Sequence, residues 1–201
     1  MNVKKFIVGL LQTNCYLVFD DDQHGFVIDP GFESEALISF IKVNKIKIDY
    51  ILITHAHFDH ISFVADLKIM TGAKICLAEN DAPLIEGSYR FGAKRFGYKE
   101  KVFAPDIILK DGQMIKIGEI KIKVIATPGH SPGGVCYYSE NENILFTGDT
   151  LFKAAIGRTD LPGSSEDSIW DSLMKKVLVL PEQTRVLPGH GPETTIKEEQ
   201  R

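Results

Sequence analysis

The feature that most constrains this sequence is the stretch 54–60, which reads Thr-His-Ala-His-Phe-Asp-His. Four of its side chains are strong metal ligands: those of His55, His57, Asp59 and His60. Imidazole nitrogen and carboxylate oxygen are donors that zinc and iron(II) accept. The stretch follows residues 50–53, a continuous apolar run typical of a buried strand. The sequence therefore predicts a fold in which a metal-binding loop leaves the carboxyl end of a central strand.

Three strands predicted in the second half of the chain, 120–126, 143–147 and 185–187, each lead into a turn that carries one more candidate ligand. These ligands are His130, Asp149 and His190. A lone His or Asp in a loop is usually solvated, but the carboxyl ends of parallel strands meet at one edge of a sheet. We therefore expect all seven side chains to lie together. His24, in a polar hairpin, is interpreted as a surface residue.

Composition narrows the class of protein. The length of 201 residues fits a single domain, 1–201, and the 44% apolar and 25% charged fractions are ordinary for a globular protein. A net charge of −4 gives no electrostatic case for nucleic acid or a membrane surface as a partner. No apolar run approaches the roughly 20 residues that span a bilayer. Three scattered cysteines argue against a disulfide framework, so we expect a reduced, cytoplasmic protein.

Apolar periodicity and turn signals predict the remaining elements. The further predicted strands are 3–8, 14–19, 25–28, 74–78, 114–117 and 133–139. Helices are predicted over 33–46, from just after His60 to Gly72, and from about 164 to 177. Residues 81–86 are expected to form at most a short helix capped by Asp81, and the tail from Lys197 is expected to fray.

The segment 87–105 breaks the periodicity and combines glycine, aromatic and basic residues. Its basic residues are Arg90, Lys94, Arg95, Lys99 and Lys101, and its one acidic residue is Glu100. One interpretation is a loop that covers a site for an anionic, partly apolar substrate. The alternative is a solvated loop or a contact with another subunit.

In order along the chain, the motifs 54–60, 128–130, 148–150 and 188–191 resemble the ligand motifs of the metallo-β-lactamase superfamily, and 29–31 resembles its earlier Asp-containing turn. The resemblance covers about residues 14–192. It implies an α/β fold, a four-layer αββα sandwich of two mixed sheets flanked by helices, with two metal ions at one rim. By the same resemblance, one ion is held by His55, His57 and His130. The other is held by Asp59, His60 and His190, with Asp149 bridging the two.

Within the superfamily, the runs 148–152, 157–160 and 190–195 are most similar to the glyoxalase II (hydroxyacylglutathione hydrolase) branch. Asp149 at the bridging place, rather than Cys, argues against the drug-hydrolysing lactamases. The chain stops about ten residues after His190, whereas longer glyoxalase II enzymes carry a C-terminal helical domain that supplies part of the glutathione site. The sequence thus resembles the compact, single-domain type, and the resemblance bears on the hydrolytic centre more directly than on glutathione recognition.

The resemblance implies a binuclear hydrolase that cleaves a thioester such as S-lactoylglutathione with a metal-bridging hydroxide. Asp59 is expected to bind metal and to orient or deprotonate the water, which makes it the candidate catalytic residue. Phe152 and Arg158 are expected to line the substrate channel, although a structural ion pair is an equal alternative for Arg158. Zinc is the expected ion, and iron or manganese would also suit these donors.

Three other functions are compatible with the motifs. A related branch, the persulfide dioxygenases, uses one iron held by two His and one Asp, which correspond here to His55, His130 and Asp149. A phosphodiester hydrolase is disfavoured by the acidic net charge. A non-enzymatic, structural metal site is disfavoured because such sites are usually closed and rich in cysteine.

Overall fold

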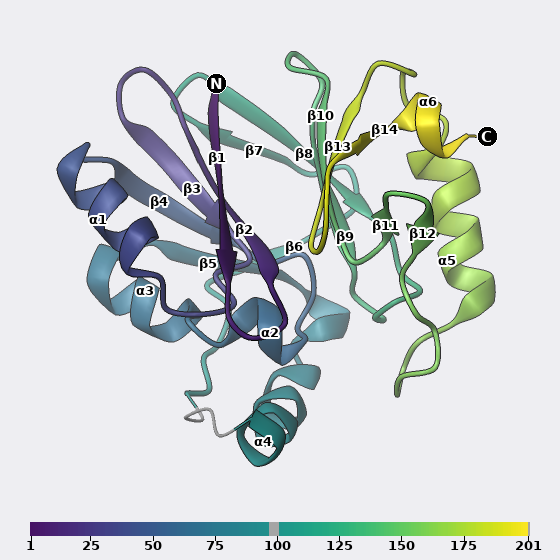
Figure 1. The fold of residues 1–201 in the computed structure, drawn as a ribbon, viewed down its shortest axis with the longest axis horizontal. Helices are drawn as coiled ribbons and strands as arrows, with labels where there is room; N and C mark the ends of the chain where they lie inside the picture. The colour runs from purple at the N-terminus through teal and green to yellow at the C-terminus, as the bar shows by residue number, and fades with distance from the viewer. Residues whose placement is uncertain (97–100, 201) are drawn as a thin grey trace.

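Two β-sheets packed face to face, with helices on both outer faces, make up the fold (Figure 1). The structure is a computed structural model, and it describes residues 1–96 and 101–200. In Figure 1 helices α1 and α3 lie outside one sheet and α5 lies outside the other. The predicted α/β class, an αββα sandwich of two mixed sheets, is therefore confirmed.

The first sheet has six strands in sequential order. They are β1 (Asn2–Val8), β2 (Thr13–Phe19), β3 (His24–Ile28), β4 (Lys47–Leu52), β5 (Lys74–Ala78) and β6 (Ile107–Leu109). The first three strands are antiparallel, and β3 to β6 are parallel. The parallel strands are joined by helices, as crossover connections require.

The second sheet also has six strands, in the order β14-β13-β10-β9-β8-β7. They are β7 (Met114–Ile117), β8 (Ile120–Ala126), β9 (Val135–Ser139), β10 (Ile144–Gly148), β13 (Arg185–Pro188) and β14 (Thr194–Thr195). Only β10 and β13 are parallel. A separate short hairpin, β11 (Leu151–Phe152) with β12 (Ala155–Ile156), follows β10.

The helices begin and end with ordinary capping chemistry. They are α1 (Glu35–Val43), α2 (Phe58–Ile61), α3 (Val64–Thr71), η1 (Glu79–Asp81), α4 (Leu84–Phe96), α5 (Glu166–Ser172), its π-helical continuation η2 (Leu173–Val177), and α6 (Ile196–Glu199). The side chains of Ser34 and Ser165 accept hydrogen bonds from the first turns of α1 and α5. Gly72 ends α3 in the left-handed conformation that glycine adopts without strain.

Apolar side chains form three buried layers. The layer between the sheets includes Phe26, Val124 and Phe146. The outer face of the first sheet packs against α1 and α3, while Ile169 and Leu173 of the α5–η2 helix cover the second sheet. Because each buried aliphatic or aromatic side chain contributes about 1.5–3 kcal/mol, these layers hold the two sheets and their helices in one arrangement.

Several predicted boundaries were wrong, for physical reasons that the structure makes plain. Asp59 and His60, expected in a loop, lie in the short helix α2. The tail from Lys197, expected to fray, forms α6, which is held by the fully buried Ile196 and capped by Thr195. Strand β6 was missed because its three residues are too few to show a period.

The largest correction concerns the segment 87–105. Its first ten residues belong to α4, and residues 97–100, which include Lys99 and Glu100, lie outside the described residues. Gly87 and Gly92, two of the glycines expected to break the chain, lie inside this helix, and a Cβ at Gly92 would be 2.7 Å from the ring of Phe58. The Tyr89 hydroxyl donates to the Ile61 carbonyl oxygen at 2.7 Å. Packing against α2 therefore outweighs the low helix propensity of glycine.

Among the described residues, no helix is both long and apolar enough to cross a lipid bilayer.

Tyr137 provides one of the hydrogen bonds that link the two halves of the sandwich. The buried Tyr137 hydroxyl of β9 donates to the Ile53 carbonyl oxygen, just after β4, at 2.6 Å. Tyr137→Phe leaves that carbonyl unsatisfied and should lower the free energy of unfolding by about 1–3 kcal/mol in urea denaturation. The matched control is Tyr50→Phe, because the Tyr50 hydroxyl makes no hydrogen bond within the described residues. Equal stability of the two variants would contradict this account.

Candidate metal centre

The seven side chains singled out in the sequence converge at one rim of the sandwich. They follow β4, β8, β10 and β13, either in the loops at the carboxyl ends of these strands or on α2. Their donor atoms form three groups in which all atoms lie within 4.8 Å of one another. The groups are His55, His57 and His130; His55, His60 and Asp149; and Asp59, His60 and His190.

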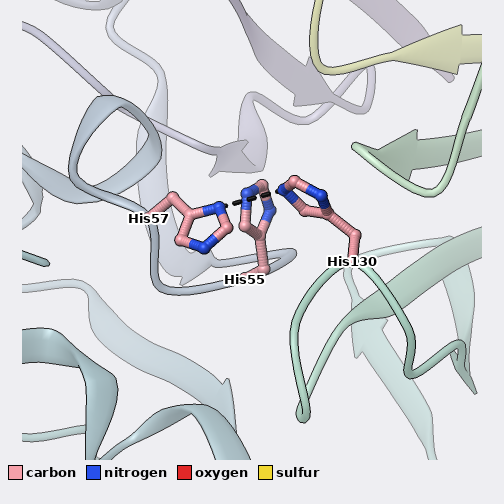
Figure 2. Close-up of side chains that lie close together, drawn as sticks. All are labelled: His55, His57 and His130. Carbon is pink, nitrogen blue, oxygen red and sulfur yellow. Dashed lines mark hydrogen bonds between the residues drawn. The ribbon is translucent and has the colours of Figure 1, made fainter. Parts of the chain in front are cut away.

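The first group consists of three imidazoles. Figure 2 shows His55 and His57, from the loop after β4, and His130, from the loop after β8, with their rings directed toward one another. The Nδ1 atom of His57 is 2.9 Å from the Nε2 atom of His130. The Nε2 atom of His55 is buried and has no hydrogen-bond partner in the described part of the chain.

Asp59, His60 and His190 form the second donor group, which combines one carboxylate with two imidazoles and shares His60 with the group that contains Asp149. The Nε2 atoms of His60 and His190 are 3.3 Å apart. The Oδ2 atom of Asp59 lies 3.2 Å from His190 Nε2 and 3.6 Å from His60 Nε2. This group offers a mixed nitrogen and oxygen donor set, in contrast to the all-nitrogen first group.

Asp149 lies between the two groups. Its Oδ2 atom is 3.6 Å from the Nε2 atoms of both His130 and His190, and 4.0 Å from that of His55. Its Oδ1 atom is 3.4 Å from His60 Nε2, is buried, and has no hydrogen-bond partner among the described residues. One carboxylate thus contacts members of both groups, which is the position a bridging ligand requires.

In four of the five imidazole rings, the nitrogen that faces away from the cluster is hydrogen-bonded to a neighbouring group. His130 Nδ1 is 2.9 Å from the Arg158 carbonyl oxygen, and His190 Nδ1 is 3.1 Å from the Leu11 carbonyl oxygen. Since a carbonyl oxygen only accepts, each Nδ1 carries the proton, and each Nε2 presents its lone pair to the cluster. The assignment for His60 and His55 depends on Asp29.

Asp29 orients the remaining two rings from beneath the cluster. Its buried carboxylate lies 3.0 Å from His60 Nδ1 and accepts hydrogen bonds from the Thr54 amide and hydroxyl at 2.8 and 2.7 Å. The Thr54 hydroxyl oxygen is in turn 3.0 Å from His55 Nδ1. Both rings therefore direct Nε2 into the cluster, and only His57 directs Nδ1 there.

The electrostatic field of the cluster differs from one group to the other. Burial, and then the neighbouring His130, lower the pKa of His57 to about 4, and burial likewise depresses the pKa of His55. Burial opposes protonation of His60 as well, but the carboxylates of Asp149, Asp59 and Asp29 hold its pKa well above the ordinary value. His55 and His57 thus offer neutral lone pairs, and the carboxylates around His60 create a negative field that stabilises positive charge.

Residues of β2 hold the loop that carries His190, and no sequence motif predicts this role. Asn14 Nδ2 donates to the carbonyl oxygens of Pro188 and Gly191, both at 2.9 Å, and the Tyr16 hydroxyl donates to the Pro188 carbonyl at 2.7 Å. Both side chains are buried. Because their targets are backbone atoms more than 170 residues away in the chain, no local pattern marks them.

The other candidate residues lie around the cluster. The half-buried Phe152 places its ring centroid 6.4 Å from that of His190. The exposed guanidinium of Arg158 forms a two-pronged ion pair with Asp160 at 2.6 and 2.7 Å, while its backbone carbonyl holds His130. His24, expected at the surface, is outside the cluster, half-buried and 2.7 Å from an Asp49 carboxylate oxygen.

The donor set fits divalent metal ions. Lone pairs of neutral imidazoles directed at one point repel one another unless a cation lies between them, and two buried acceptors here have no hydrogen-bond partner among the described residues. The field that raises the pKa of His60 would equally stabilise a metal cation in place of that proton.

Comparison with known proteins agrees with this geometry. The family model "Metallo-beta-lactamase superfamily" matches residues 8–190. The chain belongs to that superfamily. In this family divalent metal ions bound by His and Asp are the rule, and the cluster described above has that composition.

Among curated relatives, the chain is 33% identical to "Hydroxyacylglutathione hydrolase GloC" of Haemophilus influenzae, over 100% of this chain and 96% of the relative. Three solved structures are also similar. BLEG-1, titled a B3 metallo-beta-lactamase, has a TM-score of 0.92 at 38% identity, covering 99% of this chain and 96% of that one. TTHA1623, in a di-iron-bound form, has a TM-score of 0.89 at 37% identity, covering 99% of this chain and 98% of that one. ETHE1 from Myxococcus xanthus has a TM-score of 0.84 at 25% identity, covering 100% of this chain and 82% of that one.

Gly189 permits the close approach of the second group to Asp149. A Cβ at this position would lie 2.3 Å from Asp149 Oδ1 and 2.7 Å from His60 Cε1. Gly189→Ala should therefore displace the carboxylate and weaken zinc binding by at least about tenfold, measured by competition with a chromophoric chelator. The control is Gly87→Ala on α4, where an added Cβ meets nothing within 4 Å. Zinc affinity unchanged in Gly189→Ala would show that the carboxylate tolerates displacement.

Proposed function

We propose that this protein is a binuclear metal hydrolase that cleaves a small-molecule thioester such as S-lactoylglutathione. The observation that carries the proposal is the linked pair of donor groups, three imidazoles on one side and Asp59, His60 and His190 on the other, with Asp149 between them. A single structural ion needs only one such group. Two groups joined by a carboxylate suit two ions that share a water.

In this proposal His55, His57 and His130 hold one ion, Asp59, His60 and His190 hold the other, and Asp149 contacts both. When bound, two such ions lower the pKa of a shared water toward neutrality and polarise a carbonyl group. Zinc is the ion we propose. Iron is the alternative, supported by the di-iron form of TTHA1623 and by the borderline character of the donors.

Asp59 is the proposed catalytic residue. Burial opposes its ionisation, but the adjacent His60 and His190 hold the pKa of its carboxyl well below the usual range. Its Oδ2 atom faces the two imidazoles, and the Thr13 hydroxyl lies 3.4 Å away. A carboxylate beside a metal ion can accept a hydrogen bond from a water on that ion through an oxygen that does not bind the metal. We therefore assign it the task of orienting the attacking water by accepting its hydrogen bond.

The thioester as substrate class is supported by the relative named hydroxyacylglutathione hydrolase, which the chain matches along its whole length. Phe152 is the proposed apolar wall beside His190. Helix α4 packs on α2, which carries two of the proposed ligands, and its basic residues Lys94 and Arg95 are exposed. Both features suit an anionic thiol carrier such as glutathione.

Two separate changes should each lower thioesterase activity: removal of the metal ions, and removal of the Asp59 carboxylate. Chelated protein should lose thioesterase activity toward S-lactoylglutathione and regain it with zinc. Asp59→Asn should lower kcat by about 10²–10⁴-fold, the range of acid–base and orienting groups. Asp171→Asn, in the exposed face of α5, serves as the matched control.

The contradicting outcome is fully metallated protein that leaves S-lactoylglutathione and other small thioesters intact. A β-lactam should be included as a substrate because BLEG-1 is titled a lactamase. Hydrolysis of the β-lactam without thioester cleavage would replace the proposed substrate while leaving the metal centre in place.

Arg158 allows substrate contact to be separated from metal binding. Arg158→Ala removes the exposed guanidinium but keeps the backbone carbonyl that holds His130. If Arg158 leaves Asp160 to pair with a substrate carboxylate, KM for an acidic thioester should rise about two- to fivefold, the size expected of an exposed ion pair. The zinc content, measured by atomic emission, should not change. A lowered zinc content would assign the side chain to the metal centre instead.

A persulfide dioxygenase is the second candidate, favoured by the similarity to ETHE1 and by one part of the site. His55, His130 and Asp149, the residues that correspond to a two-His, one-Asp iron site, lie together, with His130 Nε2 3.6 Å from Asp149 Oδ2. Oxygen consumption with glutathione persulfide by iron-loaded protein distinguishes this candidate, since hydrolysis uses no oxygen.

A further inference from the structure

A buried carboxylate outside the seven-residue cluster contacts the loops of the first donor group. Asp81 ends η1, directly after β5, and its side chain is completely buried. The sequence predicted it as a helix cap. Its carboxylate instead accepts hydrogen bonds from the loops that carry His55, His57 and His130.

Three donors converge on this carboxylate. Asp81 Oδ2 accepts hydrogen bonds from the Ala56 amide at 2.8 Å and from the Ser131 hydroxyl at 2.9 Å. Oδ1 accepts from the Gly133 amide at 2.5 Å. Burial raises the pKa of Asp81, and the three hydrogen bonds oppose that shift.

The three donors belong to the two loops that carry the first donor group. Ala56 separates His55 from His57, while Ser131 follows His130. The first loop leaves the first sheet and the second loop lies in the second sheet. Gly133 is fitted closely against this carboxylate, since a Cβ there would lie 2.8 Å from Asp81 Oδ1. One side chain therefore joins the two halves of the molecule beneath the three imidazoles.

The second donor group has no contact of this kind with Asp81. Its ring His60 is fixed by Asp29, and His190 by the Leu11 carbonyl oxygen. Asp29 thus contacts His60 directly and His55 through Thr54, whereas the hydrogen bonds of Asp81 reach only the loops that carry the first group.

We propose that Asp81 is a positioning residue for the ion held by His55, His57 and His130, and that it sets the separation of the two loops that carry them. The inference rests on the proposed two-ion function. It assigns to Asp81 no contact with the ion or the substrate, only the hydrogen bonds described above.

A carboxylate suits this place because it accepts at both oxygens and donates at neither. In Asp81→Asn one of the two oxygens becomes an NH2 group, which would face an amide or hydroxyl donor. The loop that meets this donor must move away. The rings on that loop then lose their alignment for the ion.

The experiment measures zinc affinity in two variants, each of which keeps only one of the two donor groups intact. His190→Ala leaves the three-imidazole group intact, and His130→Ala leaves the group of Asp59, His60 and His190 intact. Asp81→Asn is added to each background, and zinc dissociation constants are measured by chelator competition. We expect a weakening of about 10–100-fold in the His190→Ala background, the usual effect of losing a residue behind a ligand. In the His130→Ala background we expect less than a threefold change.

Equal weakening in both backgrounds, or none in either, would overturn the inference. A general loss of stability is monitored with Asp106→Asn, because the Asp106 carboxylate also accepts a backbone hydrogen bond, from Ile75 at 2.8 Å, and pairs with Lys68 far from the rim. If Asp81→Asn does not fold, Ser131→Ala removes one of the three donors. It should weaken zinc binding in the same background only, and unchanged affinity there would equally overturn the inference.

Failure of the proposed function gives a different result. If neither parent background binds zinc, the two-ion centre itself is wrong. If both bind zinc and Asp81→Asn acts on both alike, the centre stands and only the role of Asp81 is rejected.

Discussion

The mutual repulsion of lone pairs is the constraint on which this rim depends. Five imidazoles and two carboxylates direct their acceptor atoms into a space where donor atoms of each group lie within 4.8 Å of one another. Among the described residues, two of these acceptors, His55 Nε2 and Asp149 Oδ1, are buried without a hydrogen-bond partner. A cation among these side chains would satisfy them, so a metal-binding centre follows from their chemistry, in agreement with the superfamily to which the chain belongs.

Each half of the fold supplies some of the loops that carry the proposed ligands. The first sheet supplies the loop and short helix after β4, and the second supplies the loops after β8, β10 and β13. Behind these loops lie the buried groups Asp29 and Thr54, which hold the rings of His60 and His55 in one tautomer. The packed layers fix where the loops leave the sheets, and the polar groups fix how their side chains point.

Much of this could be predicted from the sequence, because it is encoded locally. The apolar run before His55 and the strand-end positions of His130, Asp149 and His190 were enough to gather the candidate ligands at one rim. Helix α4 was missed because its glycines are compensated by packing on α2, a contact invisible along the chain. Asp81, Asn14 and Tyr16 were missed as supports because their partners are backbone atoms of distant loops. The order of residue types along the chain does not indicate such long-range contacts.

The crowding of four proposed ligands into residues 55–60 also affects the unfolded chain. A disordered segment with three imidazoles and a carboxylate this close together is itself a weak chelator. Bound metal stabilises a native protein only by the difference between its affinities for the folded and unfolded states. The stability that a bound metal ion would confer on this protein is therefore smaller than its affinity for the native centre implies.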